Sequence, residues 1–522
     1  MALTSSLMVL AALAMASTAD ALLTMEKVGN FTTTSDDPFE IIVTKPSTNH
    51  LFVAATSGVT VFVLDPDTLD PTLIGFYNAT ATHGESTSVA YNDVYDELAI
   101  SVAAYDPLTL GQVHIISSVE DWITCGLCDD YVQILTTGYL PDMVTFTPDG
   151  RRILTANEGE PFDYATAEND PPGTVSIFKR NSTMTYSLAC EVDFEKFDKP
   201  YRTRILSERG VRITGKNFTT FSMDVEPEYI AVTANGNTAY VSLQENNAVA
   251  KIAIKECEVK RIYPLGYKEW GNGIMFDASD KDDMINLMDW PTVKGMYQPD
   301  AIATFKTGDK QYFLTANEGD AREYGDEDDD GYYTDEIRVE DLAEELGVNG
   351  TLYGETMLGR LKVTDAAPFD GDMDELYAFG GRSISIFDGK SGDLVWDSGD
   401  FIETYTADED NGFSDIFNSE GSTDSFDKRS DDKGPEPEGL VVTEIDDRLY
   451  VFVALERIGG WMVWDITDAE NPVFQSYTNS FEDDSAPESG AIIPAEFSPT
   501  GHALLIGAYE DSNTIAVFQI TT

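Results

Sequence analysis

The hydrophobic residues of this chain recur as pairs of short runs joined by polar turns. A typical unit opens with Pro and an acid, passes through an apolar run, turns at residues such as Asp, Gly and Asn, and ends a second apolar run on an acid. Two such runs predict a β-hairpin. The stretch LTANEG, found at 154–159 and 314–319, is the second run of two units. Seven units can be counted, which open at Glu40, Glu85, Pro141, Pro227, Pro299, Pro437 and Pro487.

A third β-type run follows each hairpin, and a fourth usually comes next. The third runs are residues 59–65, 112–117, 174–179, 249–254, 383–388, 461–466 and 514–520. Repeated four-stranded meanders are typical of a β-propeller. The sequence therefore predicts an all-β protein with a seven-bladed propeller. An eight-bladed propeller is the alternative, in which residues 375–381 form their own blade although they lack a Pro–acid opener.

The two ends of the chain are expected to meet. The last unit stops at its third run, and residues 23–31, which resemble the fourth run of the first unit, can complete it. This strand would close the ring and remove an exposed sheet edge. Residues 22–522 are thus predicted to be one domain. Irregular residues 258–295 separate two blades, an acidic insertion at about 319–382 contains a helix at 339–346, and an acidic run at about 403–434 reads as a mobile loop.

The N-terminus predicts export. Residues 7–15 are apolar, and Ala19-Asp20-Ala21 fits a small-x-small cleavage site, so residues 1–21 read as a signal peptide. No other segment is apolar for about 18 residues, and no transmembrane segment is predicted. The protein is therefore expected to be secreted, extracellular or at the cell surface.

Cysteines and sequons fit that location. The four cysteines, expected to form disulfides with pairing left open, are Cys125, Cys128, Cys190 and Cys257. Cys125 and Cys128 could close a small ring. Glycosylation sequons stand at Asn30, Asn78, Asn181, Asn217 and Asn349.

The charge of the chain limits the classes of partner that it can bind. Asp and Glu outnumber Lys and Arg by 93 to 33, which gives a net charge of −60. Such a field repels nucleic acid and attracts cations, so divalent cations are the expected partners. Solubility in a salty medium is the alternative explanation of the charge.

Acids mark both ends of each predicted hairpin. Since a hairpin reverses direction, its opening and closing acids should lie at one mouth of the propeller channel. Two explanations stay open for such a cluster, pairing with Arg and turn groups or coordination of calcium. The candidate metal ligands are Asp142, Glu158, Glu228, Glu245, Asp300, Glu318, Glu438 and Glu456, with Glu40, Glu85, Glu488, Asp106 and Glu510 at the remaining hairpin ends.

Two local stretches resemble half of a calcium loop. One has D-x-D-x-D-G spacing at Asp326, Asp328 and Asp330, and the other has D-x-D-x-D spacing at Asp370, Asp372 and Asp374. Neither has the closing Glu of an EF-hand, and solvated acidic loops are the alternative. The chain contains no G-x-S-x-G or H-E-x-x-H motif, and no catalytic residue is assigned.

Several long stretches resemble the family of mesenchyme-specific cell-surface glycoproteins and their choice-of-anchor I relatives. They are PLGYK (264–268), DASDKD (277–282), GMYQPDAIA (295–303), LTANEGDAREYG (314–325), DELYAFGGRSISIFD (374–388) and RSDDKGPEPEGL (429–440). The resemblance implies an extracellular propeller glycoprotein. It also implies an association with calcium and biomineral deposition in animal members, and phosphatase-like labels in some microbial ones.

Two functions of different class follow. The first is a calcium-binding surface or matrix glycoprotein without catalysis, whose partners would be an extracellular matrix or a mineral surface. The second is a calcium-dependent phosphoesterase, which needs cationic side chains beside the metal to hold phosphate. The candidates for that role are Arg322, Arg382 and Arg457, together with Lys433. The net negative charge favours the first function, because it repels polyanionic substrates.

Overall fold

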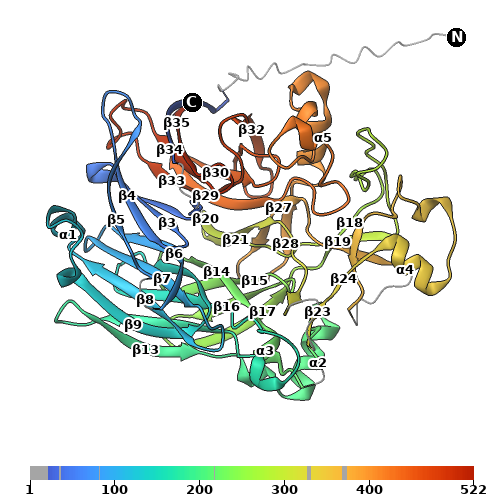
Figure 1. Ribbon diagram of the computed structural model, residues 1–522, viewed down its shortest axis with the longest axis horizontal. Coiled ribbons are helices and arrows are strands. Elements are labelled where there is room, and N and C mark those ends of the chain that lie inside the picture. The colour runs from blue at the N-terminus through green and yellow to red at the C-terminus, as the bar shows by residue number, and fades with distance from the viewer. Residues whose placement is uncertain (1–21, 34–36, 81–82, 217, 326–330, 367–372) are drawn as a thin grey trace, which may run out of the picture.

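The computed structural model describes residues 22–33, 37–80, 83–216, 218–325, 331–366 and 373–522. In this part of the chain, seven sheets have four antiparallel strands each (Figure 1). The first four are β2 (Ile42–Lys45), β3 (His50–Ala55), β4 (Gly58–Leu64) and β5 (Pro71–Tyr77); β6 (Gly84–Asn92), β7 (Glu97–Ala104), β8 (Leu110–Ser117) and β9 (Val132–Tyr139); β10 (Pro141–Phe146), β11 (Arg152–Asn157), β12 (Thr174–Arg180) and β13 (Tyr186–Val192); β14 (Pro227–Val232), β15 (Thr238–Leu243), β16 (Ala248–Ala253) and β17 (Glu258–Pro264).

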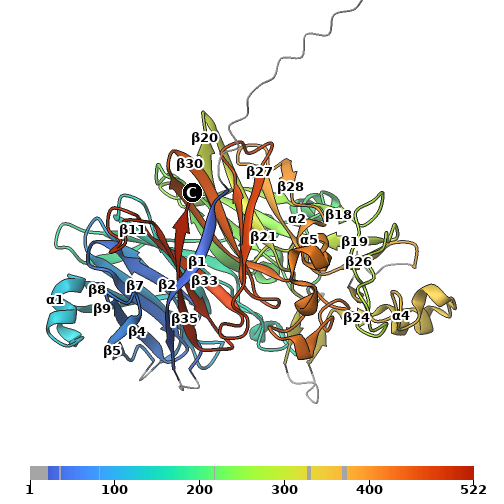
Figure 2. The same ribbon diagram turned by 90° about the horizontal axis from the view of Figure 1, so that it is seen from above.

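Two of the other three sheets include strands from distant parts of the sequence, whereas the strands of the sheet formed by residues 437–478 are consecutive. The three sheets are β20 (Ile302–Thr307), β21 (Lys310–Asn317), β27 (Ser383–Asp388) and β28 (Leu394–Asp397); β29 (Pro437–Ile445), β30 (Arg448–Leu455), β31 (Trp461–Asp465) and β32 (Val473–Thr478); β33 (Pro487–Ile493), β34 (Leu504–Tyr509), β35 (Thr514–Thr521) and β1 (Thr24–Thr32). In the last sheet β1 runs antiparallel to β35, as Figure 2 shows, with Thr24 opposite Thr521. The predicted completion of the last unit by the N-terminal strand is confirmed.

The first strands of the seven sheets follow one another around an axis. Each contacts its neighbours in the order β2, β6, β10, β14, β20, β29 and β33, and β33 contacts β2. Such radial repetition of four-stranded sheets is the propeller arrangement. The predicted all-β propeller fold is confirmed. Residues 375–381, which would form a blade in the eight-bladed alternative, contribute their strand to a separate sheet.

The hydrophobic core lies between the faces of neighbouring sheets. Leu51 and Val53 of β3 pack with Leu504 and Ile506 of β34, and all four side chains are buried. The other sheets share clusters of the same kind, which bury the alternate side chains of each strand. The packing leaves the opening ends of the first strands facing the axis.

A separate five-stranded sheet lies beside the propeller, on the side away from α1 (Val119–Thr124) (Figures 1 and 2). Its strands are β18 (Tyr267–Glu269), β19 (Val293–Met296), β26 (Leu376–Ala378), β25 (Lys362–Thr364) and β24 (Glu336–Arg338). It has its own core, which includes Trp270, Trp290 and Leu358. Residues 258–295 were expected to be irregular, but residues 258–264 form β17 of the fourth propeller sheet, and β18 and β19 pair with strands of the insertion. Helix α4 (Val339–Leu346) matches the prediction for 339–346.

Residues 403–434 correct a prediction. The run expected to be a mobile loop begins inside α5 (Phe401–Ala407) and contains three short 3-10 helices, which are η6 (Glu409–Asn411), η7 (Ser414–Ile416) and η8 (Thr423–Ser425). Phe417, Asn418 and Ser430 are fully buried. The polar composition was misleading because a few apolar side chains, such as Phe413 and Phe417, and buried hydrogen bonds such as those of Asn418 hold this segment in place.

The remaining elements are short. They are β22 (Glu323–Tyr324), β23 (Tyr333–Thr334), α2 (Pro200–Glu208), α3 (Phe221–Asp224), η1 (Pro46–Thr48), η2 (Asp129–Tyr131), η3 (Ala167–Asn169), η4 (Glu195–Phe197) and η5 (Thr351–Tyr353). Disulfides join Cys125 to Cys128 and Cys190 to Cys257. Within the described ranges, no helix combines the length and apolarity that crossing a membrane requires.

Candidate functional site

The opening acids of six sheets meet in one cavity at the axis. Its volume is about 360 Å³. Apart from Asp320, the carboxylates that line it belong to predicted hairpin ends: Glu40, Asp142, Glu228, Asp300, Glu318, Glu438, Glu488 and Glu510. In four sheets the opening acid follows a Pro paired with the end of the second strand, and a β-bulge comes next. A bulge re-aims the side chain next to it, which places these acids at the mouth.

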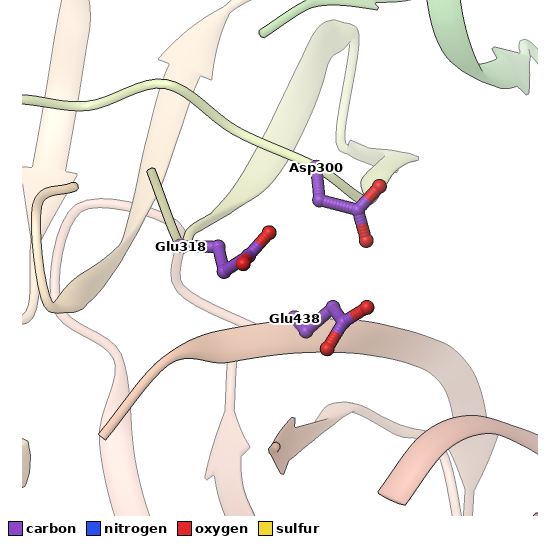
Figure 3. Close-up of side chains that lie close together, drawn as sticks. All are labelled: Asp300, Glu318 and Glu438. Carbon is purple, nitrogen blue, oxygen red and sulfur yellow. The ribbon is translucent and has the colours of Figure 1, made fainter. Parts of the chain in front are cut away.

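Three of the predicted ligands lie together. Figure 3 shows the carboxylates of Asp300, Glu318 and Glu438 grouped together; Asp300 and Glu318 flank two strands of one sheet, and Glu438 lies on β29 of the next. One oxygen from each lies within 4.8 Å of the others, and the same holds for Glu438, Glu456 and Glu488. Such spacing is close to what one hard cation bound by several carboxylate oxygens requires.

The electrostatics of the cavity disfavour bare carboxylates. Burial raises the pKa of Asp142 to about 7. Burial, followed by the charges of Glu510 and Asp142, raises the pKa of Glu40 to about 8. Burial and the charge of Asp300 raise the pKa of Glu228 well above its usual value. These groups must take up protons or share a cation near neutral pH.

One side of the cavity lacks compensating charge. Among the described residues, no Lys or Arg forms an ion pair with Asp142, Glu228, Asp300, Glu438 or Glu488. Oε2 of Glu228 and Oε2 of Glu438 are buried atoms that have no hydrogen-bond partner in this part of the chain. An unsatisfied buried polar group costs about 1–3 kcal/mol. This side of the mouth has the chemistry of a cation site.

The other side is compensated by Lys433. Its Nζ lies 2.6 Å from Oε1 of Glu318 and 3.3 Å from Oε2 of Glu436. Arg457 pairs with Glu436 and, at 2.7 Å, with Glu456. Although burial opposes its ionisation, Lys433 and the neighbouring arginines lower the pKa of Glu436 to about 2. Pairing with basic side chains, the first explanation that the sequence left open, therefore applies to this side of the mouth.

The predicted ligand Glu158 lines neither cavity, whereas Glu245 lines a second one. This space of about 300 Å³ is lined by Glu245 and adjoins the first at Asp320, a residue common to both. Burial and the charge of Asp142 raise the pKa of Glu158 well above its usual value. Burial and the charge of Glu226 do the same to the pKa of Glu245. The acids from the sequence pattern thus extend from the axis into a wider acidic mouth.

The structure corrects two of the predicted positions in the second sheet. Glu85 is exposed and does not line the cavity, where Thr87 and Ser88 lie instead. The bulge of β6 falls between Ser86 and Ser88, so Thr87 takes the place that an acid has in other sheets. Asp106 is also exposed and accepts hydrogen bonds from Leu108 and Thr109 in its own turn. This unit lacks the Pro–acid opener that would have fixed the alignment.

Several site residues were missed. Glu436 belongs to a group with Glu318 and Glu456, and Glu226 lines the second cavity. Both stand directly before the Pro of a blade opener. The repeated Glu-Pro-Glu at 226–228 and 436–438 was the available signal. Asp320 and Glu160, which follow the two LTANEG stretches, also contribute to the mouth.

The candidate anion-holding side chains are engaged within the protein. Buried Arg322 pairs with Asp224 at 2.8 Å, and buried Arg382 pairs with Glu403 at 2.5 Å. Arg457 is held by Glu436 and Glu456. None of the three is left available to hold a phosphate beside a metal, and the phosphoesterase alternative is not favoured.

The remaining predictions concern the two acidic stretches, the sequons and the signal peptide. Asp326, Asp328, Asp330, Asp370 and Asp372 lie outside the described residues, as do Asn217 and the predicted signal peptide. Asp374 does not line either cavity. The sequon residues Asn78, Asn181 and Asn349 are exposed, and Asn30 is partly exposed on β1. These four positions are geometrically open to a glycan.

Comparison with known proteins decides the family. The sequence profile of the Choice-of-anchor I domain matches residues 40–469. The chain belongs to the choice-of-anchor I family. The matched range begins at Glu40, the opening acid of the first complete sheet, and contains all the predicted mouth ligands except Glu488 and Glu510.

Two relatives of this choice-of-anchor I chain are known by name. One is the mesenchyme-specific cell surface glycoprotein of Strongylocentrotus purpuratus, 30% identical over 346 residues that make up 58% of this chain and 43% of that protein. Another is Gigasin-3a of Magallana gigas, 29% identical over 189 residues, which are 32% of this chain and 66% of that protein. The chain therefore spans less than two thirds of either relative's length.

The similarity of this fold to solved structures is weak. A chain of hydrazine synthase from Kuenenia stuttgartiensis is matched over 94% of this chain and 97% of that chain, with 12% identity and a TM-score of 0.47. A score this low carries no argument.

Proposed function

We propose that this protein is a calcium-binding glycoprotein of the cell surface or extracellular matrix that acts by binding rather than by catalysis. The observation that carries the proposal is the axial cavity, where opening acids from six sheets meet and no Lys or Arg of the described chain lines the wall. Calcium accepts six to eight oxygen ligands in flexible geometry, which suits carboxylates presented by separate strands.

The extracellular location has independent support. Residues 1–21 have the sequence of a signal peptide, both disulfides suit an oxidising compartment, and one relative is named as a cell surface glycoprotein. A net charge of −60 would draw the protein to surfaces rich in divalent cations, such as mineral or calcium-loaded matrix. A role in biomineral deposition is the finer form of the proposal.

Calcium should raise the melting temperature of the purified protein. A ligand that binds only the native state adds about 2.7 kcal/mol to the free energy of unfolding when its concentration is a hundredfold above Kd. Thermal melts in chelator and in millimolar calcium measure this gain. Equal melting temperatures in the two conditions would reject a structural calcium site. Calcium-dependent turnover of a generic phosphate ester would instead revive the enzymatic alternative.

Replacing one mouth carboxylate that has no ion pair among the described residues should show whether the mouth carboxylates bind calcium or only repel one another. Glu438→Gln keeps the shape and removes one charge from the group that includes Asp300 and Glu318. We expect calcium to bind roughly tenfold more weakly, a loss of about 1.4 kcal/mol, and the chelated variant to be as stable as the parent or more so. Glu444→Gln, on an exposed position of the same strand, is the control. Unchanged calcium affinity in Glu438→Gln would contradict the axial site.

A further inference from the structure

A second group of buried oxygen atoms lies outside the mouth. It forms where residues 277–286, next to the five-stranded sheet, meet residues 403–430 of the propeller. Hydrogen bonds connect the two segments, since the backbone N–H of Asp277 donates to Oε2 of Glu403 at 3.0 Å. Arg382 joins both, because one of its nitrogens donates to the carbonyl of Asp277 and another to the carbonyl of Ser430.

The amide of Asn418 is oriented by its neighbours. Its Nδ2 donates to Oε1 of Glu403 at 3.2 Å and to Oγ of Ser430 at 2.9 Å. The opposite orientation would place Oδ1 against a carboxylate. Oδ1 therefore points elsewhere, and although Asn418 is fully buried, this oxygen has no partner among the described residues. It is free to serve as a ligand.

Asp427 and Asp282 resemble Asn418, because each has one buried side-chain oxygen that makes no hydrogen bond to the described residues. Asp427 is 3% exposed, and its Oδ1 accepts a hydrogen bond from Ser430 at 2.6 Å. Asp282 accepts a hydrogen bond from Asn286 at its Oδ2. Oδ2 of Asp427 and Oδ1 of Asp282 are buried yet remain without a partner in the ranges that the structure covers. The two carboxylates and the amide thus each keep one unused oxygen.

The local charge is not balanced. Asp277, Asp282, Glu403 and Asp427 carry four carboxylates, whereas Arg382 is the cation placed among them, with Nη1 on Glu403. Burial, followed by the charges of Asp277 and Asp282, raises the pKa of Asp427 to about 8. Burial, followed by the charge of Glu403, raises the pKa of Asp277 to about 7. Like charges at this depth require a counterion or protons.

We propose that Asp282, Asn418 and Asp427 bind a second divalent cation of the calcium type, separate from the axial mouth. Carboxylate and amide oxygens are the ligands that calcium prefers, and water can complete its shell. The ion would clamp the segment that precedes β19 to the segment that precedes β29. This site does not depend on the axial one, since none of the three residues lines either mouth cavity.

The test counts bound ions. Native mass spectrometry of chelated protein titrated with calcium should show Asp282→Asn binding one ion fewer per chain than the parent, with the axial ion retained. Glu438→Gln should affect only the axial ion. The control is Asp283→Asn, at the exposed neighbouring position. An unchanged ion count in Asp282→Asn would overturn the proposal, whatever happens at the mouth.

A local readout covers the case in which a variant folds poorly. Hydrogen exchange of the parent protein in chelator and in calcium should show slower exchange at residues 414–430 when calcium is present. In Glu438→Gln that protection should persist. Asp427→Asn should abolish it while leaving calcium-dependent protection of the blade openers. Protection confined to the openers in the parent would refute the second site.

Discussion

The residues before the opening prolines hold an unusual backbone. Leu140, Gln298, Glu436 and Ala486 have φ values of 44°, 39°, 50° and 57°, a left-handed region that costs a non-glycine residue about 1–2 kcal/mol. Strain of this kind persists where the surroundings over-determine it, and it clusters at functional sites. Each of the four stands one residue before a Pro and two before a mouth acid. The strained turn therefore helps to aim the acid at the axis.

Lys433 is the residue on which the compensated side of the mouth depends. Although burial opposes its charge, Glu318, Glu436 and Asp320 raise the pKa of Lys433 well above its usual value. Lys433→Met leaves buried carboxylates without their cation, which should lower the free energy of unfolding by about 3–5 kcal/mol in chelator. Urea unfolding measures the loss.

Calcium should reduce the loss in Lys433→Met, because a divalent ion can replace the ammonium group. The matched control is Lys428→Met, whose exposed pairing with Glu420 should cost no more than about 1 kcal/mol. An equal loss for Lys433→Met with and without calcium would show that a divalent ion does not replace the ammonium group on this side of the mouth.

At the scale of elements, local sequence patterns predicted the strands of the blades, but they did not predict pairing between strands that are far apart in the sequence. Hairpins such as β10–β11 are visible because both strands and their turn lie within one short stretch. The five-stranded sheet was missed because β19 and β26, only four and three residues long, pair in parallel across about eighty residues of chain. No sequence period spans such a contact. The same holds for the site. The hairpin acids could be predicted, and Lys433 was a candidate cation beside them. Its pairing with Glu318 and Glu436 could not be predicted, because Lys433, like Asp427, lies in a segment with no β pattern.

The two disulfides should differ in what they stabilise. Cys190–Cys257 joins β13 to the turn before β17 and closes a separation of 67 residues, so it links two neighbouring sheets. The chain-entropy estimate for a loop of that size is about 4 kcal/mol, against about 1.5 kcal/mol for Cys125–Cys128, which spans three residues. Denaturant unfolding of the two double Cys→Ser variants should show this order. The reverse order would mean that the native contacts around α1 outweigh chain entropy.

At the scale of the whole molecule, the mouth concentrates a charge that the entire surface carries. Only 33 basic residues face 93 acidic ones, and several of the basic residues are used inside the fold, as Arg322 and Arg382 show. The propeller brings one strand end from each sheet to the axis, so opening acids carried by six of the seven units gather around one cavity. Closure of the ring thus creates the site, and a single blade would not possess it.

The stability of the chelated protein should fall as pH rises from about 5 to 8. Buried Asp142, Glu40 and Glu456 have folded pKa values of about 7, 8 and 8, above their usual 3.8 and 4.5. Between those limits the folded protein holds more protons than the unfolded chain, so rising pH favours unfolding, by about 1.4 kcal/mol per pH unit for each extra proton. Glu436 acts in the opposite direction: its pKa is lowered to about 2 in the folded state, so its ion pairs stabilise the fold above pH 4.5, and this stability is lost as pH falls from about 4.5 to 2.

Calcium should cancel the decline above pH 5, because it binds the ionised carboxylates and displaces their protons. The gain in melting temperature from calcium is therefore expected to be small at pH 5 and large at pH 8. Melts across this range, each in chelator and in calcium, measure the difference. A calcium gain that is equal at both ends of the range would mean that the ion does not bind the groups whose pKa values are raised, and the axial site would have to be abandoned.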